Sequence, residues 1–452
     1  MEVLTPETIP AVLENLEGGE KHGDYVYMYP PRQAYRRFDP ATSAKLSELI
    51  VSSLEHSDLL NLYFHVPFCK QICAFCNLYT TRLGKDTDLH GYVELLIAEA
   101  RLYARMTERK TVQTFYLGGG TPSLLDPHDV ETLITRALPM FMADGTPPPA
   151  EIAIEVAPET VDAARLRDLR DAGINRINLG LQSTVPEEVA RFGRRRSTSR
   201  CHTLIEEALG IGFANVCVDL IYGLRHQTDN GWETSLRDVI ELSPPTVCAY
   251  ALTSRPHTGY RRNGFEGAKP DVLYRRYELA QQMLVGSGYT QETHVRWTKE
   301  GGGYLQKEYH WGMQNLLGIG AGARSYLWNV DTRNGYSIQS RADALSHYTN
   351  SISKGDFSIV DGFLMSTEER ARKAVVLGIM DLDRVWFKDL IGSDPVALFS
   401  EEFGLLERFG LCTIVGDRIR LTERGRKYRD IIVQMFFSET VRQRLSGFHY
   451  LE

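Results

Sequence analysis

Three of the seven cysteines lie close together, at Cys69, Cys73 and Cys76, in the order C-x3-C-x2-C. Cysteine thiolates are the usual ligands of iron–sulfur clusters. Three thiolates hold three irons of a cubane cluster and leave the fourth iron open to another ligand. An open iron predicts chemistry at the cluster rather than electron storage alone. The spacing by itself also allows a zinc site or three buried thiols.

Two further groups that could bind a ligand follow apolar segments farther along the chain. The run Gly118–Thr121 contains three consecutive glycines, which leave backbone groups open to close approach by a ligand. Glu155 lies near the end of an apolar run, where its carboxylate can accept hydrogen bonds from both hydroxyls of a ribose. A tight bend and a surface acid are the alternative interpretations.

A second polar set comprises Gln182, Arg194 and Asp219, of which Gln182 and Asp219 follow two more apolar runs. Arg194 offers two parallel N–H groups to a carboxylate, Asp219 can accept from an amino group, and Gln182 can do either. Arg194 also belongs to a basic run that fits a solvated face. The set is therefore suited to an amino acid-like ligand.

Alternating strands and helices must position these residues. The predicted strands are Leu60–Val66, Thr114–Leu117, Glu151–Val156, Arg176–Leu181, Asn215–Ile221 and Val247–Leu252. The predicted helices between them include Tyr92–Met106, Ala163–Ala172, Pro186–Phe192 and Thr203–Ile211. Such alternation favours a parallel α/β sheet with crossover helices, and six units are too few for a closed eight-fold barrel. Ligands of such sheets gather at the carboxyl ends of the strands, where the polar residues fall.

The cysteine motif and its surroundings resemble a known family. The string Tyr63-Phe64-His65-Val66-Pro67-Phe68-Cys69, with Phe75 just before the third cysteine, is similar to the radical S-adenosylmethionine (radical SAM) enzymes. Within them it resembles the branch that holds oxygen-independent coproporphyrinogen oxidase, the related haem chaperones and the class C methyltransferases. This resemblance implies a partial (β/α)6 barrel, a 4Fe–4S cluster and two SAM molecules as cofactors.

The resemblance also implies roles for single residues. Cys69, Cys73 and Cys76 match the cluster ligands, and Tyr63, Gly119 and Glu155 match contacts of the first SAM. The residues that match contacts of a second SAM are Phe75, Gly120, Thr121, Gln182, Arg194, Asp219 and Ala251. Arg324 lies in a glycine–alanine run, Leu317–Ser325, which resembles the loop that returns to the SAM pocket.

Four residues are candidates for catalytic roles near the substrate: Tyr63, Glu292, His294 and His310. Glu292 and the two histidines have side chains that transfer protons in enzymes. Each of these three also fits the interpretation of a structural polar residue that is satisfied by its neighbours.

Four regions are expected along the chain. Residues 1–57 form an N-terminal arm, residues 58–330 the barrel and its extension, and residues 331–360 a linker. Residues 361–452 form a small winged-helix-like α+β domain and tail, because helical patterns precede two short β-like runs across a Gly-Asp turn within Cys412–Leu421. The resemblance implies that this domain covers the substrate cleft and that the arm lies near the active site.

Charge and composition limit the kinds of partner and the location expected for this protein. The formal net charge of −7 over 452 residues gives no support to a nucleic-acid partner. No apolar run approaches the roughly 18 residues of a membrane span, and the first residues lack the pattern of a signal peptide. A cytoplasmic location follows, in which Cys201, Cys217, Cys248 and Cys412 are interpreted as small isolated hydrophobic residues. The expected partner is an electron donor such as flavodoxin or ferredoxin.

Two departures from coproporphyrinogen oxidase guide the choice of reaction. Leu78 stands where the oxidase has a further cysteine, and Arg225 where it has proline. We therefore expect a class C methyltransferase, which transfers a methyl group, or a methylene that closes a cyclopropane, from the second SAM to an sp2 carbon. Its acceptor would be a small molecule or peptide of natural-product biosynthesis. The alternatives are coproporphyrinogen oxidation and a non-catalytic haem chaperone.

Overall fold

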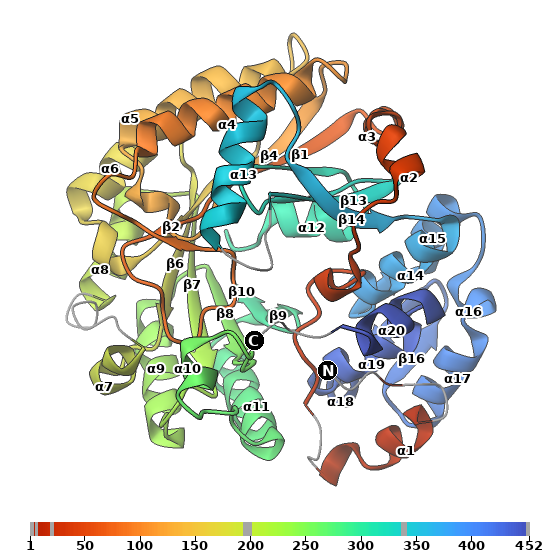
Figure 1. Ribbon diagram of the computed structural model, residues 1–452. Helices are drawn as coiled ribbons and strands as arrows, with labels where there is room; N and C mark the ends of the chain where they lie inside the picture. Colours follow the sequence, from red (N-terminus) through yellow and green to blue (C-terminus); the bar gives the residue numbers. More distant parts are fainter. Residues whose placement is uncertain (1–3, 5–7, 19–21, 193–200, 336–340, 449–452) are drawn as a thin grey trace.

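The computed structural model describes residue 4 and residues 8–18, 22–192, 201–335 and 341–448. Within these residues, twelve strands form one sheet that runs through the middle of the molecule (Figure 1). Six neighbouring strands are parallel and follow chain order: β1 (Leu59–Val66), β4 (Thr111–Gly119), β5 (Glu151–Val156), β6 (Arg176–Gln182), β7 (Asn215–Tyr222) and β8 (Thr246–Ala251). These strands confirm the predicted α/β class, and each of the six predicted strands is present.

The alternation of side chains along β1 shows how one strand serves two faces. Leu62 and Phe64 are fully buried in the main hydrophobic core, whereas Tyr63 and His65 line a cavity on the opposite face. Successive side chains of a strand point to opposite faces, so the same segment builds the core and the candidate site.

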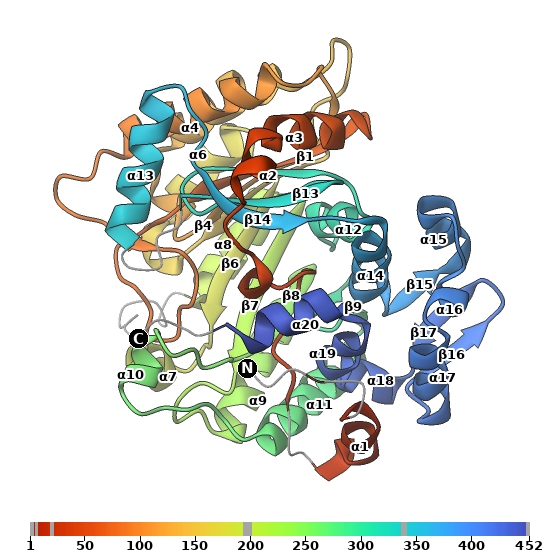
Figure 2. The same cartoon turned by 45° about the vertical axis from the view of Figure 1, so that its right-hand side comes forward.

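Crossover helices cover the core face of the parallel strands (Figures 1 and 2). They are α4 (Leu89–Ala104), α5 (Pro127–Thr132), α6 (Ala163–Asp171), α7 (Pro186–Arg191), α8 (Cys201–Ile211), α9 (Asp229–Leu242) and α11 (Pro270–Gly286). Several begin at a capping side chain: Asp88 accepts from the Gly91 N–H, and Asp162 from the Arg165 N–H. Such caps satisfy backbone donors that a helix start leaves open.

The sheet continues beyond the six parallel strands at both edges. β11 (Leu316–Ile319) runs parallel to β1, and β12 (Arg324–Tyr326), β13 (Val330–Asn334) and β14 (Ile359–Leu364) follow it as antiparallel strands. At the other edge, β10 (Arg296–Thr298) and β9 (Thr290–Thr293) extend the sheet from β8. A short helix, α12 (Leu305–Trp311), precedes β11.

The structure differs from the prediction of a linker at residues 331–360. This segment holds most of β13, the helix α13 (Arg341–Ser353) and the start of β14. β13 is buried along its whole length because it pairs with β12 on one side and β14 on the other. The segment therefore belongs to the main sheet, and the barrel unit extends to about residue 364.

The C-terminal part folds as a separate small unit beside the sheet (Figure 2). Its helices are α14 (Thr367–Gly378), α15 (Arg384–Ile391), α16 (Pro395–Leu398) and α17 (Ser400–Arg408). A three-stranded sheet follows the order β15 (Asp381–Asp383), β17 (Arg418–Leu421), β16 (Cys412–Val415), as expected for a winged-helix-like unit. The helices α18 (Glu423–Lys427), α19 (Arg429–Ile432) and α20 (Glu439–Ser446) then return towards the main sheet.

The N-terminal arm joins the two parts. Its helix α1 (Ile9–Glu14) packs in the same hydrophobic core as Phe403 and Phe436 of the C-terminal unit, and Tyr29 is fully buried there. The arm then continues into α2 (Pro40–Ala44) and α3 (Leu46–Glu55), which lead to β1. None of the described helices has a stretch long and apolar enough to cross a membrane.

Candidate active site

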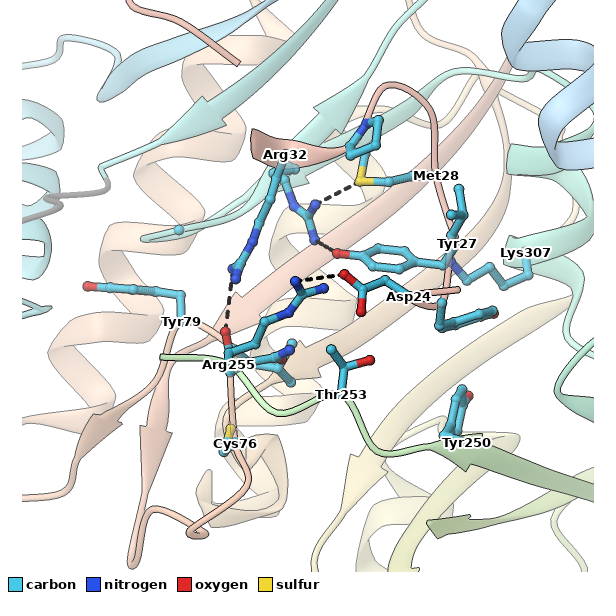
Figure 3. A pocket seen from close by; sticks show the side chains of 18 of the residues that line it. Asp24, Tyr27, Met28, Arg32, Cys76, Tyr79, Tyr250, Thr253, Arg255 and Lys307 are labelled. Carbon is cyan, nitrogen blue, oxygen red and sulfur yellow. Dashed lines mark hydrogen bonds and ion pairs between the residues drawn. The ribbon is translucent and has the colours of Figure 1, made fainter. Parts of the chain in front are cut away.

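A cavity of about 550 Å³ lies at the carboxyl ends of the parallel strands, between the sheet, the N-terminal arm and the C-terminal unit (Figure 3). Most residues selected from the sequence line it. They are Tyr63, Phe75, Cys76, Gly119, Glu155, Gln182, Asp219, Ala251, His310 and Arg324. Residues from widely separated segments thus converge at the edge of the sheet where ligands are expected.

The cysteine loop borders this cavity. Cys69 ends the short strand β2 (Phe68–Cys69), which pairs with β3 (Thr81–Arg82). Cys69 and Cys73 are buried and Cys76 faces the cavity, while the Thr121 hydroxyl donates a hydrogen bond to the Cys69 Sγ at 3.4 Å. Three thiols on one short loop beside a cavity fit a cluster with one open iron.

The glycine run and Glu155 form one unit. The Gly119 N–H donates to Glu155 Oε2 at 2.9 Å, and the Tyr116 hydroxyl donates to Oε1 at 3.2 Å. Gly119 has a φ of +121°, and a Cβ there would lie 2.7 Å from the His65 ring. Only glycine therefore fits at this position. Burial raises the pKa of Glu155 to about 7.

A hydrogen-bonded pair at the end of β1 orients Tyr63. The His65 Nε2 lies 3.0 Å from the Tyr79 carbonyl oxygen, and its Nδ1 lies 2.9 Å from the Tyr63 hydroxyl. Burial lowers the pKa of His65 to about 4, so the ring is neutral near pH 7. Because a carbonyl only accepts, Nε2 carries the hydrogen and Nδ1 accepts from Tyr63.

A second polar group lies on the neighbouring strands β6 and β7. The Asn178 Nδ2 donates to Asp219 Oδ2 at 2.9 Å, and burial raises the pKa of Asp219 to about 6. Gln182 has a φ of 72° at an irregularity in the pairing of β6 with β7, a conformation that side chains adopt only under constraint. The buried Asn178 Oδ1 has no hydrogen-bond partner among the described residues, which leaves an acceptor in the cavity wall.

Comparison with known proteins decides the family. Residues 63–239 match the model of the radical SAM superfamily. The heme chaperone HemW of Escherichia coli (strain K12) is 32% identical over 61% of this chain and 72% of its own length. The HemW of Mycobacterium tuberculosis (strain ATCC 25618 / H37Rv) is 30% identical over 82% of this chain and 93% of its own length. The chain belongs to the radical SAM superfamily.

Two further relatives narrow the branch. The oxygen-independent coproporphyrinogen III oxidase of Cereibacter sphaeroides is 28% identical over 85% of this chain and 88% of its own length. The structure of coproporphyrinogen III oxidase (HemN) from Escherichia coli superposes with a TM-score of 0.77 at 22% identity, over 91% of this chain and 96% of that one. The homologues are thus HemW and HemN-like oxidases, and the fold is close to that of HemN.

Family membership identifies a 4Fe–4S cluster and SAM as the cofactors of this radical SAM protein. The thiols, the Gly119–Glu155 unit and the Asn178–Asp219 pair are chemically suited to these groups, since they offer thiolates, ribose acceptors and an acceptor for an amino group. The assignment of each residue to a cofactor atom stays a prediction.

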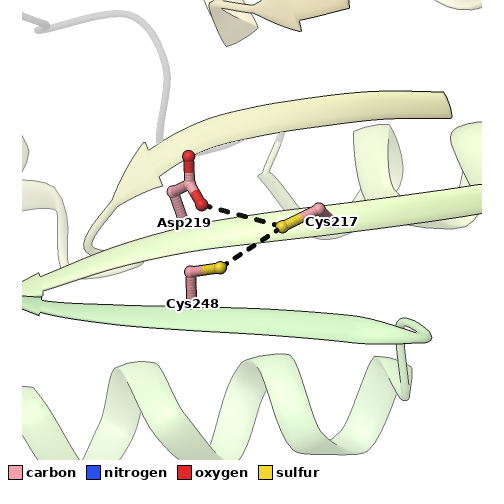
Figure 4. A group of neighbouring side chains, drawn as sticks. All are labelled: Cys217, Asp219 and Cys248. Carbon is pink, nitrogen blue, oxygen red and sulfur yellow. Dashed lines mark hydrogen bonds between the residues drawn. The ribbon is translucent and has the colours of Figure 1, made fainter. Parts of the chain in front are cut away.

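Two of the four cysteines outside the motif, Cys217 and Cys248, lie beside Asp219 (Figure 4). The Cys217 Sγ lies 3.7 Å from the Cys248 Sγ and 3.7 Å from Asp219 Oδ1. Burial raises the pKa of the Cys217 thiol, so it is protonated and can donate to the carboxylate. Both cysteines are buried, as the sequence interpretation expected, but they are not isolated, because neighbouring strands bring them together.

Several predicted residues lie away from the cavity wall. Glu292 forms two hydrogen bonds with the Arg296 guanidinium, at 2.6 and 2.8 Å. The His294 Nδ1 lies 2.8 Å from the Arg426 carbonyl oxygen, and its ring stacks on Tyr277. Neither residue lines the cavity, and their contacts fit the structural interpretation rather than proton transfer.

Three other predicted contacts of the second SAM need separate mention. Gly120 and Thr121 lie beside the cysteine loop rather than in the cavity wall, and a Cβ at Gly120 would be 2.7 Å from the Phe68 carbonyl oxygen. Arg194 lies outside the described residues.

His310 does border the radical SAM cavity. Its ring centroid lies 4.5 Å from that of Tyr326, and its Nε2 is buried without a hydrogen-bond partner in the described chain. Burial holds the pKa of His310 well below its ordinary value, so the ring is neutral. A neutral imidazole facing a cavity can accept a proton from a ligand.

Sequence reasoning missed much of the remaining wall. Asp24 of the arm and Arg255 form an ion pair at 2.8 Å, and Lys307 of α12 lies nearby (Figure 3). The C-terminal unit contributes Gln434, Phe437 and Leu445, which agrees with its expected place over the cleft. No local motif marks these residues, because only the packing of distant segments brings them together.

Proposed function

We propose that this chain is a radical SAM enzyme that transfers the methyl group of a second SAM to an sp2 carbon of an aromatic or unsaturated acceptor. If the carbon from the second SAM is instead transferred as a methylene group, ring closure on the acceptor would give a cyclopropane. The observation that carries the proposal is Leu78 in the wall of a cavity that holds two polar groups, each suited to a SAM molecule. A 4Fe–4S cluster held by Cys69, Cys73 and Cys76 would supply the electron for reductive cleavage of the first SAM.

The two groups fall on different strands of the sheet. The first comprises Tyr63 within β1, and Gly119 and Glu155 at the ends of β4 and β5. The second comprises Gln182 and Ala251, the last residues of β6 and β8, and Asp219 within β7, with Phe75 of the cysteine loop also in the cavity wall. Two neighbouring ligand sites would place the methyl of one SAM beside the radical made from the other.

The residue after the cysteine loop also supports methyl transfer. Leu78 lines the cavity and is 47% exposed, at the position where the resemblance to coproporphyrinogen oxidase implies a cysteine. A leucine side chain has no thiol and can neither donate a proton nor act as a thiolate. Any reaction step that requires the cysteine therefore cannot take place in this chain.

Coproporphyrinogen oxidation is the second candidate. The named relatives, which include oxygen-independent coproporphyrinogen III oxidases, favour it over methyl transfer. The cavity also contains five cationic side chains, which suit a substrate with several carboxylates. The HemW relatives support haem binding without turnover as a further alternative.

The stoichiometry of SAM tests the two-site proposal directly. Reconstituted protein should bind two SAM per chain in equilibrium dialysis, and Asp219→Ala should bind one and keep its cluster absorption. Asp356→Ala, a matched change on the surface near α13, should still bind two. A single SAM in the wild-type protein, or two in Asp219→Ala, would refute the assignment.

The choice of substrate needs a second assay. Consumption of coproporphyrinogen III with release of carbon dioxide would establish the oxidase, and a stable haem complex without cleavage of SAM would establish the chaperone. Under the methyl-transfer proposal neither is seen. The electron for either enzyme reaction is expected from a flavodoxin or ferredoxin, which can be tested by replacing dithionite with each protein.

A further inference from the structure

The cavity wall carries more cationic side chains than carboxylates, since its acids are Asp24, Glu155 and Asp219. Five cationic side chains line it, of which Arg255 pairs with Asp24 and Arg333 with Asp361. The other three, Arg32, Lys307 and Arg324, have no carboxylate within ion-pair distance in the described chain. Burying a cation without an anion is unfavourable, so this arrangement favours a ligand that brings one.

Two of these cations flank the same aromatic ring. The Lys307 Nζ lies 5.1 Å from the centroid of Tyr27 and the Arg324 Cζ lies 5.4 Å from it, while Arg324 also donates to the Tyr27 hydroxyl at 2.6 Å. Figure 3 shows the side chain of Lys307 beside Tyr27. The backbone N–H of Lys307 donates to the Tyr304 carbonyl oxygen, but its ammonium group, which has three donors, makes no hydrogen bond within the described residues.

The surroundings of Lys307 raise the energy of its charged form. Burial lowers its pKa to about 7, and Arg296 from β10, Arg324 from β12 and Arg429 from α19 act in the same direction. Cys248 on β8 opposes them weakly. An anion bound beside the ammonium would relieve this repulsion.

We propose that the acceptor carries a carboxylate, or a similarly compact anion, that binds Lys307 and Arg324 beside Tyr27. The proposal rests on the proposed function, because it names the class of acceptor. The surrounding tyrosines, among them Tyr25, Tyr250 and Tyr326, suit a flat unsaturated body attached to that anion. The methionine carboxylate of SAM is the other possible source of the same chemistry, and the experiment separates the two.

The probes are indole-2-carboxylate and indole-2-carboxamide, which share a shape and differ in charge. Their binding is measured by calorimetry on reconstituted protein saturated with SAM. We expect the acid to bind at least about tenfold more tightly than the amide, since a charge-assisted hydrogen bond contributes about 1.5–3 kcal/mol. Equal affinity of the two probes, or binding of neither, overturns the proposal.

Variants locate the effect. Lys307→Met should abolish the preference for the acid and leave the affinity for SAM unchanged, whereas Lys307→Arg should keep the preference. The control is Lys299→Met, because Lys299 also lies over a tyrosine ring, at 4.3 Å from Tyr289, but outside the cavity. If Lys307→Met weakens SAM instead of the acid, the anion belongs to SAM and the proposal is wrong.

The pH dependence gives an independent check. The acid needs the protonated amine, so its affinity should be constant below about pH 7 and fall up to about tenfold per pH unit above it. The fall should be absent in Lys307→Arg. A failure of the methyl-transfer proposal can be distinguished from a failure of the anion-site proposal, because the preference for the acid is a binding property that does not require turnover.

Discussion

The Gly119 N–H donates a hydrogen bond to Glu155 Oε2 at 2.9 Å. The bond links the end of β4 to the end of β5, and so joins two residues that resemblance assigns to one SAM molecule. Since the φ of Gly119 is +121° and its missing Cβ would meet His65, the backbone geometry of this contact depends on glycine.

Gly119→Ala is therefore expected to destabilise the protein by about 1–3 kcal/mol, the usual range for a side chain held in a strained backbone conformation. The affinity for the first SAM should fall with it, because relief of the backbone strain shifts the N–H at position 119 away from Glu155. Urea unfolding and SAM dialysis measure the two effects. Gly286→Ala is the control, since its Cβ would meet nothing within 4 Å, and it should leave both unchanged.

Substitution of a cluster ligand should remove the cluster. Cys76 faces the cavity. The Cys76→Ala variant should lose the visible absorption and the bound iron after anaerobic reconstitution, because the cluster needs three thiolates. Cys412→Ala, a buried cysteine on β16 of the C-terminal unit, should keep both. Full iron content in Cys76→Ala would show that the wrong cysteines have been chosen.

The second SAM should bind more weakly in acid. Burial raises the pKa of Asp219 to about 6, so below that pH its carboxyl group becomes neutral and loses its attraction for an amino group. Affinity for one of two SAM molecules should rise with pH up to about 6 and then level off. Asp219→Asn should bind this SAM weakly at every pH; a persistent pH dependence in that variant would assign the titration to another group.

His65 should contribute a loss of stability in acid. Its pKa is lowered from 6.5 to about 4 in the folded protein, so the unfolded chain binds more protons between these values. The contribution of His65 to stability is therefore complete above about pH 6.5 and declines as the pH falls towards 4. Urea unfolding of His65→Asn should show a shallower decline than the wild type, and an equal decline would exclude this role.

The sequence predicted the sheet well because each strand is an apolar run between turn residues. All six predicted parallel strands overlap the observed ones, and the polar residues at their ends, such as Glu155 and Gln182, meet in one cavity. The position of these residues at the ends of predicted strands was enough to predict that they meet, because parallel strands end at a common edge of the sheet.

The rest depended on contacts between distant segments. Tyr27, Arg255 and Lys307 come from the arm, a loop and α12, and no local pattern marks any of them. Conversely, Glu292 and His294 have suitable side chains, but an ion pair and a stacked ring hold them away from the cavity. The linker prediction failed because β13 and β14 are short strands that are buried by their neighbours rather than by their own pattern.

The most direct test of the central claim uses SAM that carries a deuterated methyl group. Reduced, reconstituted protein is incubated with it anaerobically, and the 5′-deoxyadenosine formed is examined by mass spectrometry. Methyl transfer through a second SAM predicts deuterium in the 5′-deoxyadenosine, because the hydrogen comes from that methyl group. Unlabelled 5′-deoxyadenosine, produced faster when coproporphyrinogen III is added, would contradict the account and establish the oxidase.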